Sequence, residues 1–243
     1  MKDLFGDPIQ ILRVIDFEAT GLDPDCEVVE YGFCDFAFEQ QEILASGSSL
    51  CRVSNMPPEA RAIHHIRLEE ARAFPPYDRR VLFEEAIRAG AVGFAAHSAD
   101  FEARYIIGHL PLVCTYKAAL RVWPDAPSHS VFGLLYWLED NRVVSYDRDR
   151  AFPPHRAESD AYATAVLLKA IYAAGYTGRD LAQWTREPAM LPRCPIGDWR
   201  GHRWEEIEDS FLEWILRKIY DREDVRFCAE RELDRREELR HEH

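Results

Sequence analysis

An apolar run near the start of the chain ends in two carboxylates that stand one residue apart. Residues 10–17 are rich in Ile, Leu and Val and predict a buried strand, which runs into Asp16 and Glu18. Residues i and i+2 of a strand point to the same face, so these two carboxylates share one. Neighbouring carboxylates that lose hydration repel each other, and a divalent cation between them removes the conflict. The segment therefore indicates either a metal site or an acidic strand end before a turn at Gly21.

The rest of the chain alternates between strand-like and helix-like segments. Strands come first, and strands and helices then alternate, which favours an α/β or mixed layered domain. Strands are expected at 10–17, 27–38, 43–53, 91–97 and near 112–116, and helices at 78–89, 99–109, 116–122, 130–139 and 157–174.

A stretch rich in Gly, Pro and polar residues around 176–192 predicts a domain boundary. We expect a first domain over 1–178, a linker over 179–192 and a small unit over 193–243. The core helix of that unit is expected to bury Ile207, Phe211, Trp214, Ile215 and Ile219. The highly charged tail 229–243 is expected to be a solvated helix.

Charge and cysteine content narrow the class of protein. The net charge of −13 argues against a protein that coats nucleic acid by charge, but not against an enzyme that collects carboxylates for metal ions. The six cysteines are scattered without a C-x-x-C pair, which favours reduced thiols in the cytoplasm. We find neither a secretory signal nor an apolar stretch long enough for a membrane span, so no membrane association is expected.

Two further segments place acids at the ends of regular elements. Asp100 and Glu102 stand where a strand passes into a helix, and His155 precedes Asp160 at the start of an apolar helix. Each has an ordinary explanation, since acids favour helix N-termini and a single histidine is commonly a surface residue. Together with Asp16 and Glu18, they indicate two divalent ions for phosphodiester hydrolysis. A neutral histidine beside them could accept the proton of the attacking water.

The three segments, in this order, resemble the motifs of a known family. D-x-E, then "HSADFE" (97–102), then H-x4-D is similar to the DEDDh, or DnaQ-like, 3′→5′ exonucleases. The match is closest to the exodeoxyribonuclease X branch. The stretches that carry this closer likeness are "AIHHI" (62–66), "VCTYKAALRVWP" (113–124), "HRAESDAYATAVLL" (155–168) and "PIGDWRGHRWEEIEDSFLEWIL" (195–216).

The resemblance implies an RNase H-like α/β fold, a mixed five-stranded sheet flanked by helices, with a small mainly helical C-terminal module. It implies two Mg²⁺ or Mn²⁺ ions and release of nucleotides from a 3′ end. Residue by residue, it implies the metal ligands Asp16, Glu18 and Asp160 and the general base His155. It further implies substrate contacts at Thr20, Gly21 and Leu22, with Leu22 as an apolar wedge, and at His64.

The second motif departs from the family pattern H-N-A-x-F-D. Aligning on Phe101 puts Glu102 where the family has Asp, so Glu102 is the expected metal ligand and Asp100 is the alternative. Residues i and i+2 of a helix do not share a face, so only one of them should reach the site. At the position of Ser98 the family has an Asn that commonly contacts substrate. Ser98 and Phe101 are therefore expected substrate contacts. In the C-terminal module a family Lys is replaced by Asp198, which weakens a nucleic-acid role for that module.

Three functions compete at this point. The first is a stand-alone metal-dependent 3′→5′ exonuclease acting on single- or double-stranded DNA 3′ ends. The second is an RNA-trimming exonuclease or a polymerase proofreading subunit. The third is a weakly active relative that binds nucleic acid or a partner. Intact Asp16, Glu18, His155 and Asp160 favour an active enzyme. The sequence does not indicate the oligomeric state.

Overall fold

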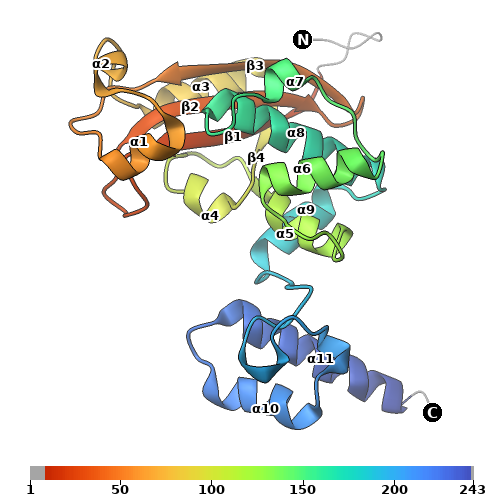
Figure 1. The fold of residues 1–243 in the computed structure, drawn as a ribbon. Helices are drawn as coiled ribbons and strands as arrows, with labels where there is room; N and C mark the ends of the chain where they lie inside the picture. The colour runs from red at the N-terminus through yellow and green to blue at the C-terminus, as the bar shows by residue number, and fades with distance from the viewer. Residues whose placement is uncertain (1–8, 242–243) are drawn as a thin grey trace.

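The computed structural model describes residues 9–241, and a five-stranded mixed sheet forms its centre (Figure 1). The strands lie in the order β3-β2-β1-β4-β5, antiparallel from β3 to β1 and parallel from β1 through β4 to β5. This confirms the mixed five-stranded sheet flanked by helices. The strand bounds are β1 Ile11–Ala19, β2 Val28–Ala37, β3 Glu42–Leu50, β4 Ala91–Ala96 and β5 Leu112–Cys114.

Helices cover both faces of the sheet, and the alternation of side chains along β1 decides which residues each face buries. Leu12 and Val14 pack in the core under helix α8, whereas Ile11 and Ile15 pack in the core under α3. The helices of this part are α1 Pro58–His64, α2 Leu68–Ala71, α3 Arg79–Ala89, α4 Ala99–Glu102, α5 Thr115–Val122, α6 Val131–Asp140, α7 Arg148–Ala151, α8 Ala157–Ala173 and α9 Gly178–Arg186.

Helix α8 lies against the sheet on the same face as Asp16 and Glu18. Ala157, Ala161 and Ala165 recur every four residues, and all three are fully buried. Residues at this spacing lie on one side of a helix, and their short side chains allow close approach to the strands. The helix contacts β1, β2 and β3, so its first turn is held near the carboxylates of β1.

The predicted helix over 99–109 is wrong beyond its first turn, because α4 ends at Glu102. The carbonyl of Tyr105 accepts a hydrogen bond from the Tyr77 hydroxyl at 2.7 Å instead of continuing a helical ladder. Gly108 then adopts a positive φ of 98°, a conformation that favours glycine over other residues. The short helix leaves the segment after Glu102 to pack irregularly against α3.

Residues 178–186 lie in helix α9 rather than in the expected linker over 179–192. Thr177 caps this helix, and the carboxylate of Asp180 accepts from the Thr177 backbone N–H at 2.7 Å. Leu181 is fully buried in the α8-side core, and α9 packs on β5 and α5. The first part of the stretch rich in Gly, Pro and polar residues therefore forms the N-cap and the body of α9. The connection to the C-terminal unit begins after Arg186.

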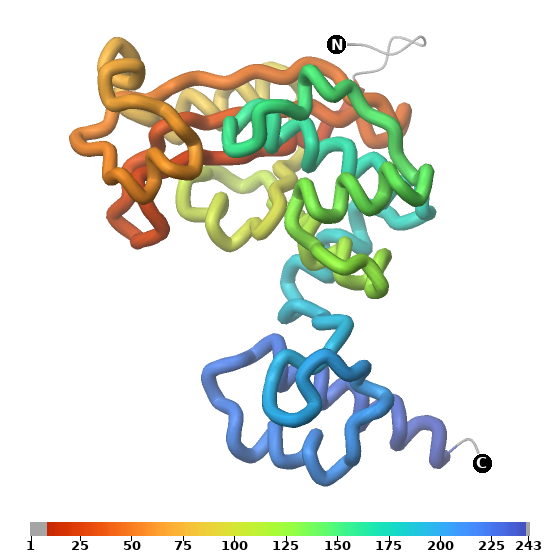
Figure 2. The backbone as a smooth tube through the Cα atoms, viewed as in Figure 1, coloured from red at the N-terminus to blue at the C-terminus, as the bar shows by residue number. Residues whose placement is uncertain are grey.

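The C-terminal unit has a core of its own and forms a separate lobe (Figure 2). Its elements are η1 Gly197–Trp199, η2 Trp204–Glu206, α10 Asp209–Lys218 and α11 Glu223–His241. Two expectations need correction. Trp214 is 40% exposed, and Leu212 is buried in its place beside Ile215. The charged tail is not wholly solvated, because Ala229 and Glu232 are buried. Glu232 is held there by Arg235 and Arg236.

The six cysteines, all within the described part of the chain, are free thiols. Over residues 9–241, none of the helices combines the length and hydrophobicity that a membrane span requires.

We propose that the first domain and the C-terminal unit fold as separate units, which a core substitution can test. Leu212→Ala should reduce the stability of the C-terminal unit by about 2–5 kcal/mol, because it opens a cavity in a fully buried position. Hydrogen exchange should quicken in α10 and α11 and stay unchanged in α8. Equal acceleration in α8 would show that both parts unfold as one unit.

Candidate active site

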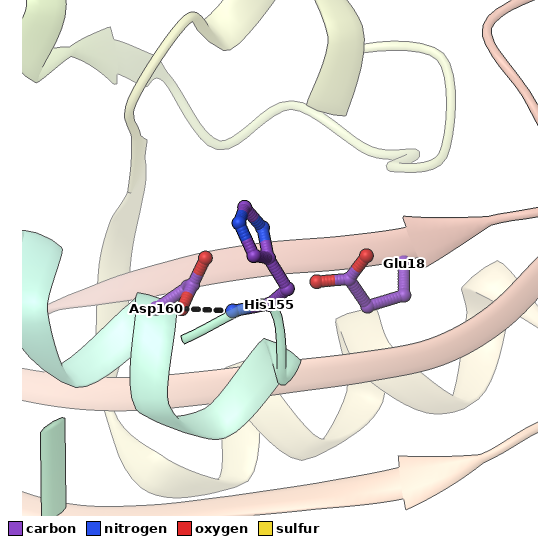
Figure 3. Close-up of side chains that lie close together, drawn as sticks. All are labelled: Glu18, His155 and Asp160. Carbon is purple, nitrogen blue, oxygen red and sulfur yellow. Dashed lines mark hydrogen bonds between the residues drawn. The ribbon is translucent and has the colours of Figure 1, made fainter. Parts of the chain in front are cut away.

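Three of the predicted site residues, Glu18, His155 and Asp160, meet where β1 ends beside the first turn of α8 (Figure 3). A carboxylate oxygen of Glu18, a ring nitrogen of His155 and a carboxylate oxygen of Asp160 all lie within 4.8 Å of one another. Glu18 and Asp160 are each only 9% exposed, whereas His155 on the preceding loop is exposed. The backbone N–H of His155 donates to Asp160 Oδ1 at 3.1 Å. The loop histidine and the helix aspartate are thereby fixed to each other.

Two further acids, Asp16 and Glu102, are linked to this cluster by their charges. Burial raises the pKa of Asp16 well above its ordinary value, and the charges of Asp160, Glu18 and Glu102 raise it further. Glu102 is 4% exposed, and its Oε2 has no hydrogen-bond partner among the residues that the structure describes. A buried carboxylate oxygen without a donor is costly unless a ligand satisfies it.

The pKa shifts of the other acids have the same physical origin. Burial raises the pKa of Glu18 to about 8, and repulsion by Asp160 and Glu30 adds to it. Burial also raises the pKa of Glu102 to about 8 and that of Asp160 to about 7. Such a set of crowded oxygen ligands fits hard divalent cations, which prefer carboxylates. Bound cations would restore the charged forms of these acids.

The two acids of the second motif lie in different environments. Glu102 is buried and acts electrostatically on Asp16, whereas Asp100 is exposed beside Ser98 and Phe101. Separation by two residues on the single turn of α4 gives them different directions, as helical geometry requires. This placement favours Glu102 over Asp100 as the acid that reaches the site.

The loop after β1 presents Leu22 to solvent. Leu22 is 80% exposed, and its carbonyl accepts a hydrogen bond from Arg104 at 2.7 Å. The base of the loop is tied at Thr20, whose backbone N–H donates to the Glu27 carbonyl at 2.9 Å. The Thr20 hydroxyl also accepts from the Glu27 backbone N–H at 3.0 Å. A Cβ at Gly21 would stand 2.9 Å from the Cys26 sulfur, so a glycine suits this position.

The remaining expected substrate contacts lie in two separate pockets. His64 is buried and lines a pocket of about 170 Å³ together with His65, Pro153 and Pro154. Its Nδ1 accepts from the Ile66 backbone N–H at 3.0 Å, and burial lowers its pKa. Ser98 and Phe101 instead line a pocket of about 530 Å³ that reaches α11. The structure thus does not bring His64 together with Ser98 and Phe101.

Sequence reasoning missed three residues beside the site, Glu30, Gly32 and Arg156. Glu30 and Gly32 lie opposite Glu18 and Asp16 in the β1–β2 register, and Arg156 pairs with Glu30. One signal was available, because Glu30 is a single carboxylate inside an otherwise apolar strand segment, "VVEYGF". A buried carboxylate requires a partner, but the partner lies 126 residues away and no local pattern identifies it.

The raised pKa values predict how the stability of the metal-free protein changes with pH. The folded protein holds protons on Glu18, Glu102 and Asp160 up to pH 7–8, whereas the unfolded chain releases them near pH 4. Their contribution to stability is therefore full below pH 4 and falls as pH rises towards 8. We therefore compare the melting temperatures of the wild type and Asp160→Asn, both without metal. The wild-type value minus the variant value should decrease from pH 5 to pH 8.

Divalent ions should reverse this trend, since their ligands must be deprotonated. Mn²⁺ should raise the melting temperature of the wild type more at pH 8 than at pH 5.5, and should have much less effect on Asp160→Asn. A metal-free melting temperature difference that stays flat or rises across this range would contradict the buried cluster.

No family model matches the sequence. Individual relatives, found by sequence and by structure, nevertheless agree on one family. Exodeoxyribonuclease 10 of Escherichia coli K12 is 28% identical over 216 residues, which cover 86% of this chain and 92% of the relative. The structure of exonuclease X in complex with 5′ overhanging duplex DNA is 30% identical, with a TM-score of 0.56, and covers 72% of this chain and 99% of that chain.

A more distant structure shows the same fold. The nuclease domain of 3′hExo bound to rAMP, described as a DEDDh family member, has a TM-score of 0.54 at 14% identity and covers 68% of this chain and 92% of its own. The mixed sheet and its helices therefore form the RNase H-like fold expected from the motifs. With 30% identity over nearly the whole of the exonuclease X chain, the protein belongs to the DnaQ-like, or DEDDh, family and is a 3′→5′ exonuclease.

Proposed function

We propose that the protein removes nucleotides from DNA 3′ ends by a two-metal mechanism with His155 as general base. The observation that carries this proposal is the meeting of Glu18, His155 and Asp160 within 4.8 Å, beside the further acids Asp16 and Glu102. The 30% identical relative, solved with 5′ overhanging duplex DNA, supports DNA as the substrate. The six free cysteines support a reducing, cytoplasmic setting.

Each site residue has a proposed role. Asp16, Glu18, Glu102 and Asp160 would hold two divalent ions, Mg²⁺ or Mn²⁺. When bound, such ions activate the attacking water and stabilise the leaving oxygen. His155 stands exposed on its loop, anchored through its backbone to Asp160, and is proposed to accept the proton of the water. A side chain held in this way can reach solvent and substrate while its ring nitrogen lies within 4.8 Å of the Glu18 and Asp160 carboxylates.

The substrate side of the site is proposed to surround the terminal nucleotide. Leu22 offers an exposed apolar surface on a loop tied at Thr20 and Gly21, which suits packing on a base. Ser98 and Phe101 would contact the same strand from α4, and His64 would do so from its pocket near Pro153. The net charge of −13 opposes contact with phosphate, so bound cations would supply much of the attraction.

A labelled-substrate assay tests the activity and its alternatives. Purified protein with Mg²⁺ or Mn²⁺ should shorten 5′-labelled DNA stepwise from the 3′ end, and EDTA should stop it. Asp16→Asn and Asp160→Asn should reduce the rate to background with the fold retained. His155→Ala should reduce kcat by about 10²–10⁴-fold, the usual contribution of a general base. Faster shortening of RNA would favour the RNA-trimming function, and an inactive wild type would favour the weakly active relative.

Paired substitutions in the second motif test the assignment of its acid. Glu102→Ala should lose activity, whereas Asp100→Ala should stay close to wild type, because Glu102 is buried and raises the pKa of Asp16 while Asp100 is exposed. Single-turnover rates at saturating Mn²⁺ and circular dichroism of both variants provide the comparison. The reverse pattern, with Asp100→Ala inactive and Glu102→Ala active, would transfer the ligand role to Asp100.

A further inference from the structure

A fifth acid, Glu30, lies beside the site, and protein groups donate three hydrogen bonds to its carboxylate. Glu30 stands opposite Glu18 in the β1–β2 register and is 1% exposed. Arg156 Nη2 donates to its Oε1 at 2.7 Å, and Arg156 Nε donates to its Oε2 at 2.9 Å. The backbone N–H of Ala157 donates to the same Oε2 at 3.1 Å. Both oxygens of Glu30 therefore have protein donors, whereas Oε2 of Glu102 has none among the residues that the structure describes.

Gly32 provides a second fixed contact two residues along β2. It lies opposite Asp16, and a Cβ built there would stand 2.2 Å from the carbonyl carbon of Ala157 and 2.4 Å from the backbone nitrogen of Glu158. These are backbone atoms, so they cannot turn aside as a side chain could. The first turn of α8 therefore rests directly on the β2 backbone, which only a glycine permits at this place.

Both contacts act on the residues between His155 and Asp160. Arg156 follows His155 directly, and Ala157 precedes Asp160 by three residues. A bidentate guanidinium–carboxylate pair fixes direction as well as distance. The pair and the glycine contact thus set where the first turn of α8 lies relative to Asp16 and Glu18. Asp160 in turn depends on that turn for its place in the cluster.

We propose that Glu30, with Arg156 and Gly32, positions the His155–Asp160 segment against the β1 carboxylates and thereby sets the geometry of the metal site. This inference rests on the proposed two-metal function. Glu30 is a positioning residue that contacts neither ion nor substrate. Residues that orient metal ligands in this way commonly change metal affinity or activity by about 10–100-fold when they are replaced.

The same two strands provide a matched control on the opposite face of the sheet. Arg13 and Asp35 form a buried bidentate pair, with Nε–Oδ1 and Nη2–Oδ2 distances of 2.8 Å. Asp35 lies on β2 five residues after Glu30, and its side chain points away from the site face. Asp35→Asn therefore removes a comparable ion pair from the same strands without touching α8. A purely structural role for Glu30 predicts the same behaviour for both variants.

The experiment compares Glu30→Gln with Asp35→Asn in the full-length chain. Mn²⁺ binding is measured by electron paramagnetic resonance without substrate, and kcat and KM are measured on the 5′-labelled DNA at saturating Mn²⁺. Both variants should melt at lower temperature than the wild type. Glu30→Gln should weaken Mn²⁺ binding and lower kcat, each by about 10–100-fold, with KM within about twofold of wild type. Asp35→Asn should leave Mn²⁺ binding and kcat unchanged.

Further variants keep the test decisive. If Glu30→Gln does not fold, Arg156→Lys replaces it under the same criteria, since an ammonium cannot span both carboxylate oxygens. Gly32→Ala should reproduce the loss of Mn²⁺ affinity by displacing α8. The proposal is wrong if the Glu30 or Arg156 variant matches Asp35→Asn in Mn²⁺ affinity and kcat. Asp160→Asn distinguishes failure of the proposed metal site from failure of the positioning role of Glu30. If Asp160→Asn retained Mn²⁺ binding and activity, the proposed metal site itself would be wrong.

Discussion

Mutual repulsion among buried carboxylates is the constraint on which the arrangement of this domain depends. The charges of Asp160, Glu18, Glu102 and Glu30 all raise the pKa of Asp16, and those of Asp160 and Glu30 raise the pKa of Glu18. Within residues 9–241, Glu30 is the one of these five acids that forms an ion pair with an arginine. The other four are the acids that we propose to be neutralised by divalent cations. The packing of α8 on β1 and β2 holds Asp160 beside the acids of β1 despite this repulsion.

Local sequence patterns predicted the elements that hold the site, because they depend on alternation and composition near each residue. Asp16 and Glu18 share a face as strand geometry requires, and His155 and Asp160 stand at the start of a helix rich in buried alanine. Helix α4 was predicted too long, since the hydroxyl of Tyr77, distant in sequence, binds the carbonyl of Tyr105. The position of Glu30 could not be predicted from local sequence either. It depends on the register between β1 and β2 and on a contact with Arg156, which is distant in sequence.

The acidic character of the chain and its expected polyanionic substrate can be reconciled within the site. A net charge of −13 repels phosphate over long distances, and several of the acids are concentrated where the scissile bond would lie. Divalent ions reverse the sign only locally, so attraction is confined to the place where chemistry occurs. Leu22, exposed on a loop that Arg104 holds through a hydrogen bond, offers an apolar surface that does not depend on charge.

The distance along the chain between β1 and α8 has a consequence for the protein during its synthesis. Asp16 and Asp160 are 144 positions apart, and a ribosome adds about 5–20 residues per second. Roughly 7 to 30 s therefore pass between the appearance of the first and the last acid of the site. During that interval strands β1 and β2 can pair. Arg156, the partner of Glu30, and helix α8, which carries Asp160, have not yet been synthesised. While the growing chain lies next to ribosomal RNA, it therefore does not yet have a complete nuclease site.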